Sequence, residues 1–482
     1  MSQMNRRSFL KRSLAAAGGV YAIGGTDVLG RVLGANETVR VGVAGLNGRG
    51  ESHVSEFAKM KGVEVVYLID PDTRTFGKRT KQVEERGGRR PQCVQDIRKA
   101  IEDKNLDAVS VATTNHWHSL ITIWACQAGK DVYVEKPLSH NLHEGRVAVE
   151  AARKFNRIVQ HGTQSRSSER KARVAALIKS GKLGKLLVSR GLCYKPRGSI
   201  GVRPPSPPPS EVDFDLWLGP APEQPHHANL VHYNWHWFWD FGNGDIGNQG
   251  VHEMDIARWA IPGATLPKSV IGLGGRFGYV DQGETPNTQI ALFDFGETQL
   301  IFEVRGLKTE GLHGEKVGNI FHLEEGTIIG DGKFIPKGRD KAEPLPKIDV
   351  EVRRGPGGGH FANFIECVRS RKVEDLNADV LEAHYSSALC HLANISYRLG
   401  ETVPFEPRTK AFGENKEAYD ALERAQEHLA KGNGLQLDGL KYRLGRKLAV
   451  DAKAETITGD REAAKLLTRS YRAPFIVPER VS

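Results

Sequence analysis

Short apolar runs alternate with polar stretches along the first third of the chain. The runs consist mostly of Val, Ile, Leu and Ala, and runs of this length are typical of strands buried on both faces of a parallel sheet. Between them lie stretches with helical periodicity, such as residues 51–61. We therefore expect a doubly wound α/β unit with strands at residues 39–44, 63–69, 106–112 and 131–134.

The pattern changes in the second half of the chain, where alternating runs predict more strands near residues 270–273, 288–295, 298–304 and 320–323. Helices are expected at residues 360–369 and in a charged region after residue 399. Residues 195–224 are rich in Pro and Gly, so they form a rim, lid or subunit arm without regular structure. The expected division is a leader at 1–35, an α/β domain at 36–162, a second α/β domain at 163–400 and a helical C-terminal arm at 401–482.

The leader contains paired arginines, Arg6 and Arg7, followed by a mildly apolar run at residues 14–23. This arrangement resembles a twin-arginine export signal, and the run is too short to span a membrane. We expect export to the periplasm or cell envelope, with a disordered basic tail as the alternative. No other segment is long and apolar enough to cross a bilayer.

Composition and charge argue against some partners and sites, but they do not indicate a function. The chain has 482 residues and a formal net charge of +10, of which the first 35 residues carry +4 (five basic residues and one acidic). No basic stripe interleaved with aromatic residues occurs, so nucleic acid is not expected as a partner. The five cysteines form no CxxC pair, so neither a metal site nor a disulfide framework is expected.

A glycine-rich turn follows the first expected strand directly. Gly45 would permit a tight turn, Gly50 would allow the next helix to pack closely on the strand, and the helix N-terminus would face a pyrophosphate. Asn47 occupies the place of the second glycine of a dinucleotide-binding motif, where it tolerates left-handed backbone angles and Gly48 adds freedom. Candidate cofactor contacts are therefore Gly45, Asn47, Gly48, Arg49 and Gly50.

The second expected strand ends in Asp70. A carboxylate there can accept hydrogen bonds from the adenosine ribose hydroxyls and would repel a 2′-phosphate, which favours NAD over NADP. Arg74 follows closely and weakens that preference, so NADP remains possible.

The next two strands also end in polar residues, and ligands of such sheets lie beyond the carboxyl ends of the strands. Lys136 follows a strand and precedes a proline, which restricts it to extended geometry. Burial would lower its pKa and suit it to exchange a proton beside a nicotinamide. The other candidate cofactor contacts in this region are Thr113, Asn115, His118, Glu135 and Gln164.

Residues 234–241 combine aromatic rings with polar groups, and Trp235, Trp237 and Trp239 alternate along them. Aromatic faces beside hydrogen-bonding groups suit sugars, whose C–H faces stack while their hydroxyls need partners. The alternative is a packed interface between domains. We expect a small carbohydrate as the substrate.

In these motifs the chain resembles the glucose-fructose oxidoreductase, inositol dehydrogenase and rhizopine-catabolism family, called Gfo/Idh/MocA. The matching segments are Gly45 to Gly50, Thr113 to His118, Glu135-Lys136-Pro137 and the residues around His252. The resemblance implies a Rossmann domain followed by an α/β domain with an open, mostly antiparallel sheet. That sheet often mediates assembly in the family, so a homo-oligomer is expected.

The resemblance also implies a lysine, an aspartate and a histidine around the reacting carbinol. The histidine corresponds to His252, but Asn248 occupies the aspartate position. Because an amide cannot take up a proton at neutral pH, His252 or Lys136 must perform the acid-base step. Asp255 lies on the same helical face and could orient the site, and Arg166 is a candidate substrate contact.

These features together predict an NAD(P)-dependent oxidoreductase that acts on a CH–OH group of a sugar, polyol or sugar derivative. Export would require the cofactor to be tightly bound and reset in each cycle, since free NAD is scarce outside the cytoplasm. The alternative is an NAD-dependent glycoside hydrolase that uses transient oxidation and elimination. A non-catalytic sugar-binding protein is a third hypothesis, against which the intact Lys136 argues.

Overall fold

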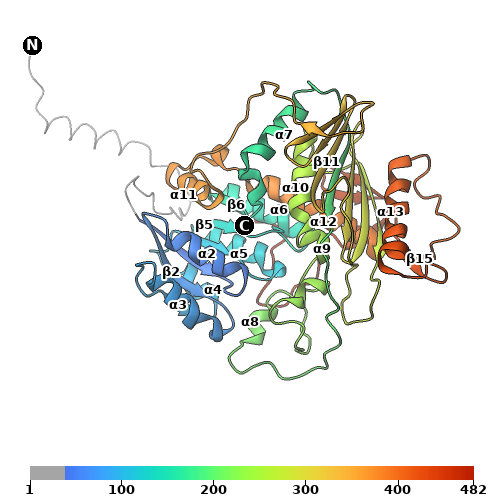
Figure 1. The fold of residues 1–482 in the computed structure, drawn as a ribbon. Coiled ribbons are helices and arrows are strands. Elements are labelled where there is room, and N and C mark those ends of the chain that lie inside the picture. The colour runs from blue at the N-terminus through green and yellow to red at the C-terminus, as the bar shows by residue number, and fades with distance from the viewer. Residues whose placement is uncertain (1–37, 482) are drawn as a thin grey trace, which may run out of the picture.

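The computed structural model describes residues 38–481 and consists of two packed α/β parts (Figure 1). The predicted export signal lies outside the described residues. Within residues 38–481, no helix has the length and apolar character needed to cross a membrane.

The first part is a six-stranded parallel sheet with the strand order β3-β2-β1-β4-β5-β6. This order is that of a dinucleotide-binding doubly wound fold, as the apolar runs predicted. Its strands are β1 (Val39–Ala44), β2 (Val63–Ile69), β3 (Gln92–Val94), β4 (Ala108–Val111), β5 (Asp131–Val134) and β6 (Val159–His161). The associated helices are α2 (Arg49–Ala58), α3 (Phe76–Glu84), α4 (Ile97–Ile101), α5 (Asn115–Gln127) and α6 (Leu142–Lys154).

The register of this sheet determines where the site lies. Ala44 pairs with Val111, and Val111 pairs with Val134, so β1, β4 and β5 end at the same level. The strands stay in place because their side chains are buried on both faces, as at Val41, Val109 and Val132. The residues that follow the three strands therefore lie side by side along one edge of the sheet.

The second part is built on a mixed, mostly antiparallel sheet, as predicted, in which only β7 and β10 pair in parallel. Its central strands are β7 (Leu186–Cys193), β8 (Ser269–Gly275), β9 (Thr288–Asp294), β10 (Gln299–Arg305) and β11 (Val317–Leu323). Shorter strands extend it: β12 (Gly326–Ile329), β13 (Lys333–Pro336), β14 (Glu343–Pro344), β15 (Glu401–Pro404), β16 (Lys441–Leu444), β17 (Leu448–Asp451) and β18 (Thr456–Thr458).

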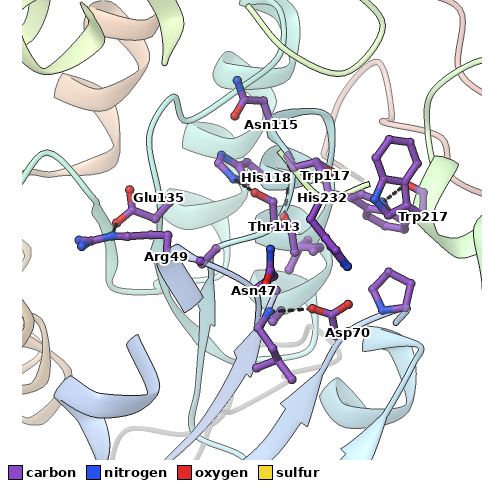
Figure 2. A pocket seen from close by; sticks show the side chains of 18 of the residues that line it. Asn47, Arg49, Asp70, Thr113, Asn115, Trp117, His118, Glu135, Trp217 and His232 are labelled. Atoms are coloured by element: carbon purple, nitrogen blue, oxygen red, sulfur yellow. Dashed lines mark hydrogen bonds and ion pairs between the residues drawn. The ribbon is translucent and has the colours of Figure 1, made fainter. Parts of the chain in front are cut away.

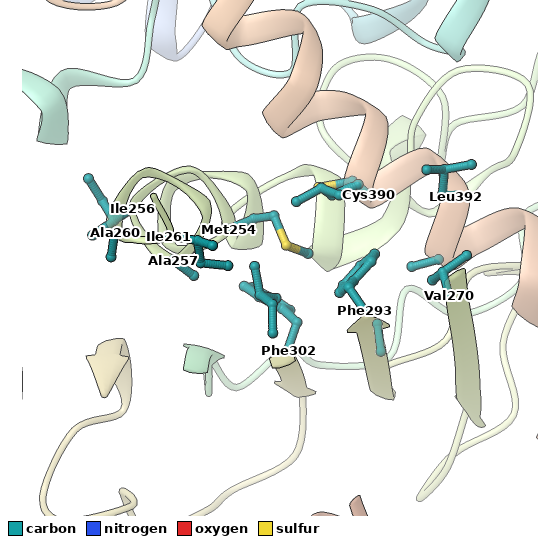
Figure 3. Packing of buried hydrophobic residues seen from close by; sticks show 14 of the residues in the cluster. Met254, Ile256, Ala257, Ala260, Ile261, Val270, Phe293, Phe302, Cys390 and Leu392 are labelled. Atoms are coloured by element: carbon teal, nitrogen blue, oxygen red, sulfur yellow. The ribbon is translucent and has the colours of Figure 1, made fainter. Parts of the chain in front are cut away.

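Helices α10 (Gly250–Ala260) and α12 (Val380–Arg398) cover one face of this sheet (Figure 3). Met254 of α10 and Leu392 of α12 pack in the same core cluster as Phe293 and Phe302 of the strands. All four side chains are fully buried, and removing such a side chain from a core typically costs about 2–5 kcal/mol. This packing fixes α10, which carries the predicted catalytic histidine.

Helix α13 (Lys416–Asn433) packs on part of the opposite face of the sheet. Its apolar residues Ala421, Leu422 and Leu429 contact a cluster that includes Ile271 and Leu292 of the strands. The chain therefore covers part of this face of the sheet with its own helix. The remaining helices are α7 (Glu169–Lys179), α8 (Phe214–Leu218), α9 (Gly244–Gly247), α11 (His360–Ser370) and α14 (Arg461–Lys465).

The C-terminal segment departs from the helical arm expected at residues 401–482. Strands β16 and β17 both pair with β8, so this segment extends the second sheet. Phe475 and Val477 then pack in the core of the first part. Helix α11 also joins the first part, where Phe364 packs with the strands. The strand pairing and the packing of Phe475 and Phe364 are contacts between residues far apart in the sequence, and local periodicity does not encode them.

Candidate active site

A crevice of about 280 Å³ lies beyond the carboxyl ends of β1, β2, β4 and β5. Residues from both parts of the molecule line it, because the loop before α10 lies across the edge of the first sheet. Figure 2 shows Arg49 and Glu135 at one end, and Asp70 with Trp217 at the other. The predicted cofactor and substrate residues in its lining are Gly45, Asn47, Gly48, Arg49, Asp70, Thr113, Asn115, His118, Glu135, Lys136, Asn248 and Trp235.

The glycine turn has the backbone geometry that the sequence predicted at two positions. Gly45 has φ +82°, and a Cβ there would lie 2.5 Å from the carbonyl oxygen of Ala112. Gly48 has φ +52° and caps α2, whereas Asn47 is not among the residues with positive φ. The left-handed conformation expected at Asn47 therefore falls on Gly48 instead, and Asn47 need not imitate glycine.

The N-terminus of α2 fits the pyrophosphate of a dinucleotide. No side chain caps this helix, and a Cβ on Gly48 would meet nothing within 4 Å. Both Gly48 and Arg49 line the crevice at this point. Backbone N–H groups and the positive end of the helix dipole thus face space in which an anion can bind.

Gly50→Ala is expected to weaken NAD binding about tenfold. The added methyl group overpacks the glycine turn and displaces it, at a free-energy cost of about 1–3 kcal/mol. A Cβ on Gly50 would lie 1.8 Å from the carbonyl oxygen of Gly45. Gly77→Ala in α3 is the control, since a Cβ there meets nothing within 4 Å. Calorimetric titration of both variants with NAD checks this, and equal affinities would contradict it.

Asp70 supports the turn as well as facing the crevice. Its Oδ2 accepts a hydrogen bond from Leu46 N at 2.7 Å, and its Oδ1 accepts one from Asp72 N at 2.9 Å. Burial raises the pKa of Asp70 to about 6, so the carboxyl is ionised at neutral pH. Each oxygen keeps a second lone pair with which it can accept from a ribose hydroxyl.

Arg74, which was expected to weaken the preference for NAD, is not among the residues lining the crevice. Its Nη2 lies 2.6 Å from Asp72 Oδ2, and His232 Nε2 lies at the same distance from that oxygen. Because Arg74 is paired with Asp72, its charge is compensated. This arrangement removes the main sequence argument for NADP.

Glu135 forms a buried anionic centre at the other end of the crevice. Its Oε1 accepts hydrogen bonds from Arg49 Nε at 2.8 Å and Gln164 Nε2 at 3.0 Å, and lies 3.1 Å from His53 Nε2. Burial opposes its ionisation, but the hydrogen bond with His53 and the charge of Arg49 hold the pKa of Glu135 well below its usual range. Gln164 therefore holds Glu135 in place and is not among the residues lining the crevice.

Lys136 and Asn248 meet across the two parts of the molecule. Lys136 Nζ donates to the carbonyl oxygen of Asn248 at 2.8 Å and to its Oδ1 at 3.2 Å. Burial lowers the pKa of Lys136, partly offset by the charge of Glu135. An ammonium has three hydrogens, so one remains for a substrate oxygen. The asparagine that replaces the expected aspartate thus orients the lysine.

His252 lies near Lys136 on α10, but it is not among the residues lining the crevice. Burial, and then the charge of Lys136, lower its pKa to about 3, so the ring is neutral. Among residues 38–481, no side chain or backbone group forms a hydrogen bond with its ring nitrogens. Its predicted role in proton transfer stays a prediction.

His236 lines the crevice and was missed as a single residue by sequence reasoning. It belongs to a short 3₁₀ helix, Asn234–Trp237, and its ring stacks on Trp235 at 3.6 Å between centroids. Burial lowers its pKa to about 3, with the charge of Lys136 contributing. Its Nδ1 lies 2.6 Å from the carbonyl oxygen of Tyr233, to which a neutral ring must donate. Nε2 therefore carries the lone pair that can accept a proton.

The three tryptophans predicted as substrate contacts lie in three different surroundings. Trp235 lines the crevice and donates from Nε1 to the carbonyl oxygen of His232 at 2.8 Å. Trp237 lines a neighbouring cavity instead. Trp239 packs near Tyr397 and under Arg398, outside both cavities, which corrects its assignment as a substrate contact.

Asp255 and Arg166 are also corrected, because they bind each other. Arg166 Nε donates to Asp255 Oδ2 at 2.8 Å and Nη2 donates to Oδ1 at 2.9 Å. Both side chains are at most 4% exposed, and Ser386 Oγ donates to the same aspartate at 2.6 Å. This buried pair joins α10 to the segment after β6 and α12, so it supports the site without contacting a substrate.

The residues that follow β4 connect the two parts. Asn115 Nδ2 donates to Asn243 Oδ1 at 3.3 Å, next to the loop that carries Asn248. His118 Nδ1 lies 2.6 Å from the carbonyl oxygen of Pro137, and its Nε2 lies 3.1 Å from that of Thr113. The His118 ring therefore lies between the segments that follow β4 and β5.

Two family models match the chain. Residues 39–163 match an oxidoreductase family with an NAD-binding Rossmann fold, and residues 190–270 match the C-terminal alpha/beta domain of an oxidoreductase family. The glycine turn, Glu135 and Lys136 lie within the first match, and His236, Asn248 and His252 within the second.

Curated relatives match the chain over part of its length. A "Glycosyl hydrolase family 109 protein" of Shewanella pealeana is 26% identical over 204 residues, which are 38% of this chain and 45% of the relative. A "Glycosyl hydrolase family 109 protein 2" of Shewanella sp. (strain ANA-3) is 29% identical over 163 residues, 30% of this chain and 36% of the relative. The matches thus span less than half the length of these relatives.

Solved structures share the fold over most of the chain. The WlbA dehydrogenase from Bordetella pertussis, in complex with NADH and UDP-GlcNAcA, has a TM-score of 0.54 at 17% identity and covers 74% of this chain and 97% of its own. GenD2 from gentamicin A biosynthesis, in complex with NAD, has a TM-score of 0.52 at 17% identity and covers 78% and 96%. At these identities the likeness shows the fold alone.

Proposed function

Since the chain belongs to the Gfo/Idh/MocA oxidoreductase family, whose Rossmann fold binds NAD, we propose that it oxidises a CH–OH group of a sugar, polyol or sugar derivative. The observation that carries this proposal is the ammonium of Lys136, which Asn248 holds at the edge of the first sheet. The carboxyl ends of these strands are where such folds bind their ligands.

Each residue around Lys136 has its own role in the proposed reaction. When bound, NAD supplies the hydride acceptor. Lys136 donates a hydrogen bond to the substrate oxygen and places it, while the charge of Glu135 partly offsets the lowering of the Lys136 pKa by burial. His236, neutral and with Nε2 as acceptor, can accept a hydrogen bond from the substrate hydroxyl, and His236 and His252 are the two candidates for taking up its proton.

The walls of the crevice suit a saccharide. Trp235 and Tyr233 present aromatic surface next to the polar edges of His236 and Asn248. Such surfaces stack on the C–H faces of a sugar while the polar groups bind its hydroxyls. Orientation by these walls lowers the entropic part of the barrier.

We also propose export by the twin-arginine route, which carries folded proteins and so allows the cofactor to be bound beforehand. The support is the pair Arg6 and Arg7 ahead of an apolar run. Fractionation of cells that express the full chain, compared with Arg6→Lys/Arg7→Lys, tests it. A homo-oligomer is proposed from the family resemblance alone, and light scattering of the purified protein measures its mass.

A second candidate function is glycoside hydrolysis by transient oxidation and elimination, with no net change in the cofactor. The relatives named glycosyl hydrolase family 109 favour it, although the matches cover less than half of their length. The same residues would serve, since the oxidation step needs Lys136 and a neutral base.

One assay separates the two functions. The purified protein, checked for nicotinamide absorbance, is incubated with free sugars and with aryl glycosides. NADH formation, or paired oxidation and reduction of two sugars, supports the oxidoreductase. Phenol release without net NADH supports the hydrolase. Absence of both reactions in protein that binds NAD would exclude both functions for the sugars tested.

A further inference from the structure

A second cavity, of about 560 Å³, adjoins the crevice. Tyr233 lines both cavities, and its side chain is 52% exposed. The ring therefore stands between the two, and a molecule longer than one sugar ring could pass it. The Pro- and Gly-rich stretch, for which a rim, lid or subunit arm was expected, forms one side of the second cavity, and residues 228–237 form the other.

The wall of this cavity combines an aromatic ring with fixed polar groups. Arg197 lies over the ring of Trp237 at 5.4 Å and donates from Nη1 to Tyr233 Oη at 3.1 Å. Arg197 is held by Asp245, to whose oxygens its Nε and Nη2 donate at 3.0 and 2.8 Å. The charge of Arg197 is therefore compensated, and its role is to orient Tyr233.

The loop around the cavity is held in one conformation by several hydrogen bonds. Ile200 N donates to Asp281 Oδ2 at 2.8 Å, and Gln282 N donates to Gly201 O at 3.1 Å. Asn229, which is 3% exposed, donates from Nδ2 to Gln282 Oε1 at 3.0 Å. The cavity is thus part of the fold, formed where two loops pair.

Arg203 supplies an uncompensated charge at this cavity. Its backbone N–H donates to Gln282 Oε1 at 3.2 Å, which anchors the residue to the paired loops. Across the part of the chain that the structure describes, no carboxylate forms an ion pair with its guanidinium. The cavity therefore contains one paired arginine and one that is available to an anion.

We propose that this cavity is a subsite for a second, negatively charged sugar ring of the substrate. The exposed ring of Tyr233 stacks on the sugar ring, and Arg203 binds its carboxylate or sulfate group. The inference rests on the proposed function, because the first ring would occupy the crevice beside Lys136. It makes the substrate an acidic disaccharide or longer glycan rather than a free monosaccharide.

The test is calorimetric binding to the NAD-loaded protein, with cellobiose, its uronic acid cellobiouronic acid and cellobiose 6′-sulfate as probes. We expect at least one acidic probe to bind about fivefold more tightly than cellobiose, and the difference to shrink at high salt. In Arg203→Gln the ratio of acidic to neutral affinity falls to about one. Arg461→Gln, an exposed arginine of α14, keeps the wild-type ratio.

Equal binding of the neutral and acidic probes to the wild type would overturn the proposal, as would no binding of any probe. So would a preference that persists in Arg203→Gln, provided that its melting temperature equals that of the wild type. Binding of one acidic probe only would identify the anion as carboxylate or sulfate. Because binding is read without turnover, this result is separate from the assay of the proposed function.

Discussion

Lys136→Met lowers kcat by about 10²- to 10⁴-fold, the range expected when a residue that positions and exchanges a proton is removed. Methionine keeps the length and the apolar stem of the side chain, so it fills the same space. It cannot donate to Asn248 or to a substrate oxygen. Either proposed reaction needs the substrate oxygen held for oxidation, so both activities fall together.

NAD binding should be almost unchanged in Lys136→Met, because the main contacts proposed for the cofactor are the glycine turn, Asp70 and the N-terminus of α2. Calorimetry with NAD and steady-state kinetics measure the two quantities on the same preparation. Lys431→Met is the matched control, since Lys431 Nζ donates to Glu427 Oε1 on α13, outside the crevice. Wild-type turnover in Lys136→Met would refute the assignment of this residue.

The parts of the fold that sequence predicted are those in which local pattern determines the structure. The run at residues 39–44 became β1 because apolar residues on both faces leave few other places for it. Gly45 and Gly50 could be identified because each position has a steric reason to lack a side chain. The structure confirms this: a Cβ on Gly45 would clash with the carbonyl oxygen of Ala112, and a Cβ on Gly50 would clash with that of Gly45. Lys136 was predicted from its place after a strand, and it lines the crevice.

The errors came from contacts between residues far apart in the sequence. Arg166 and Asp255 were assigned separate roles, because nothing in the sequence shows that residues 89 positions apart form a bidentate pair. The same limit hid the pairing of β16 with β8. His236 was missed for another reason: the aromatic run at residues 234–241 gives no sign of which rings face the crevice. Only its contact with Tyr233 O indicates the tautomer in which Nε2 is an acceptor.

Glu253→Gln is expected to make unfolding less pH-dependent, and it tests the electrostatics behind the site. Glu253 lies on α10 next to His252, is 5% exposed, and has an Oε2 that no group in residues 38–481 hydrogen-bonds. Gln249 Nε2 donates to its Oε1 at 3.3 Å. Burial, opposed mainly by the charge of Lys171, raises the pKa of Glu253 from 4.5 to about 8.

The sign of the effect follows from this raised pKa. Below pH 4.5 the carboxyl is protonated in both the folded and unfolded states, and its contribution to stability is fully present. Above that pH the unfolded chain loses the proton while the folded protein keeps it, so the contribution is lost until the pH passes about 8. The free energy of unfolding of the wild type thus falls by about 5 kcal/mol relative to Glu253→Gln over this range, at about 1.4 kcal/mol per pH unit.

Urea denaturation of both proteins at several pH values between 4.5 and 9 measures this difference directly. Glu374→Gln, at an exposed position in a 3₁₀ helix, should give a curve parallel to the wild type. A constant difference between wild type and Glu253→Gln would mean that the buried carboxyl is ionised in the folded protein. Its charge would then have to be balanced by Lys136 or Lys171, and the lysine beside the nicotinamide site would be held more strongly in its charged form than the geometry indicates.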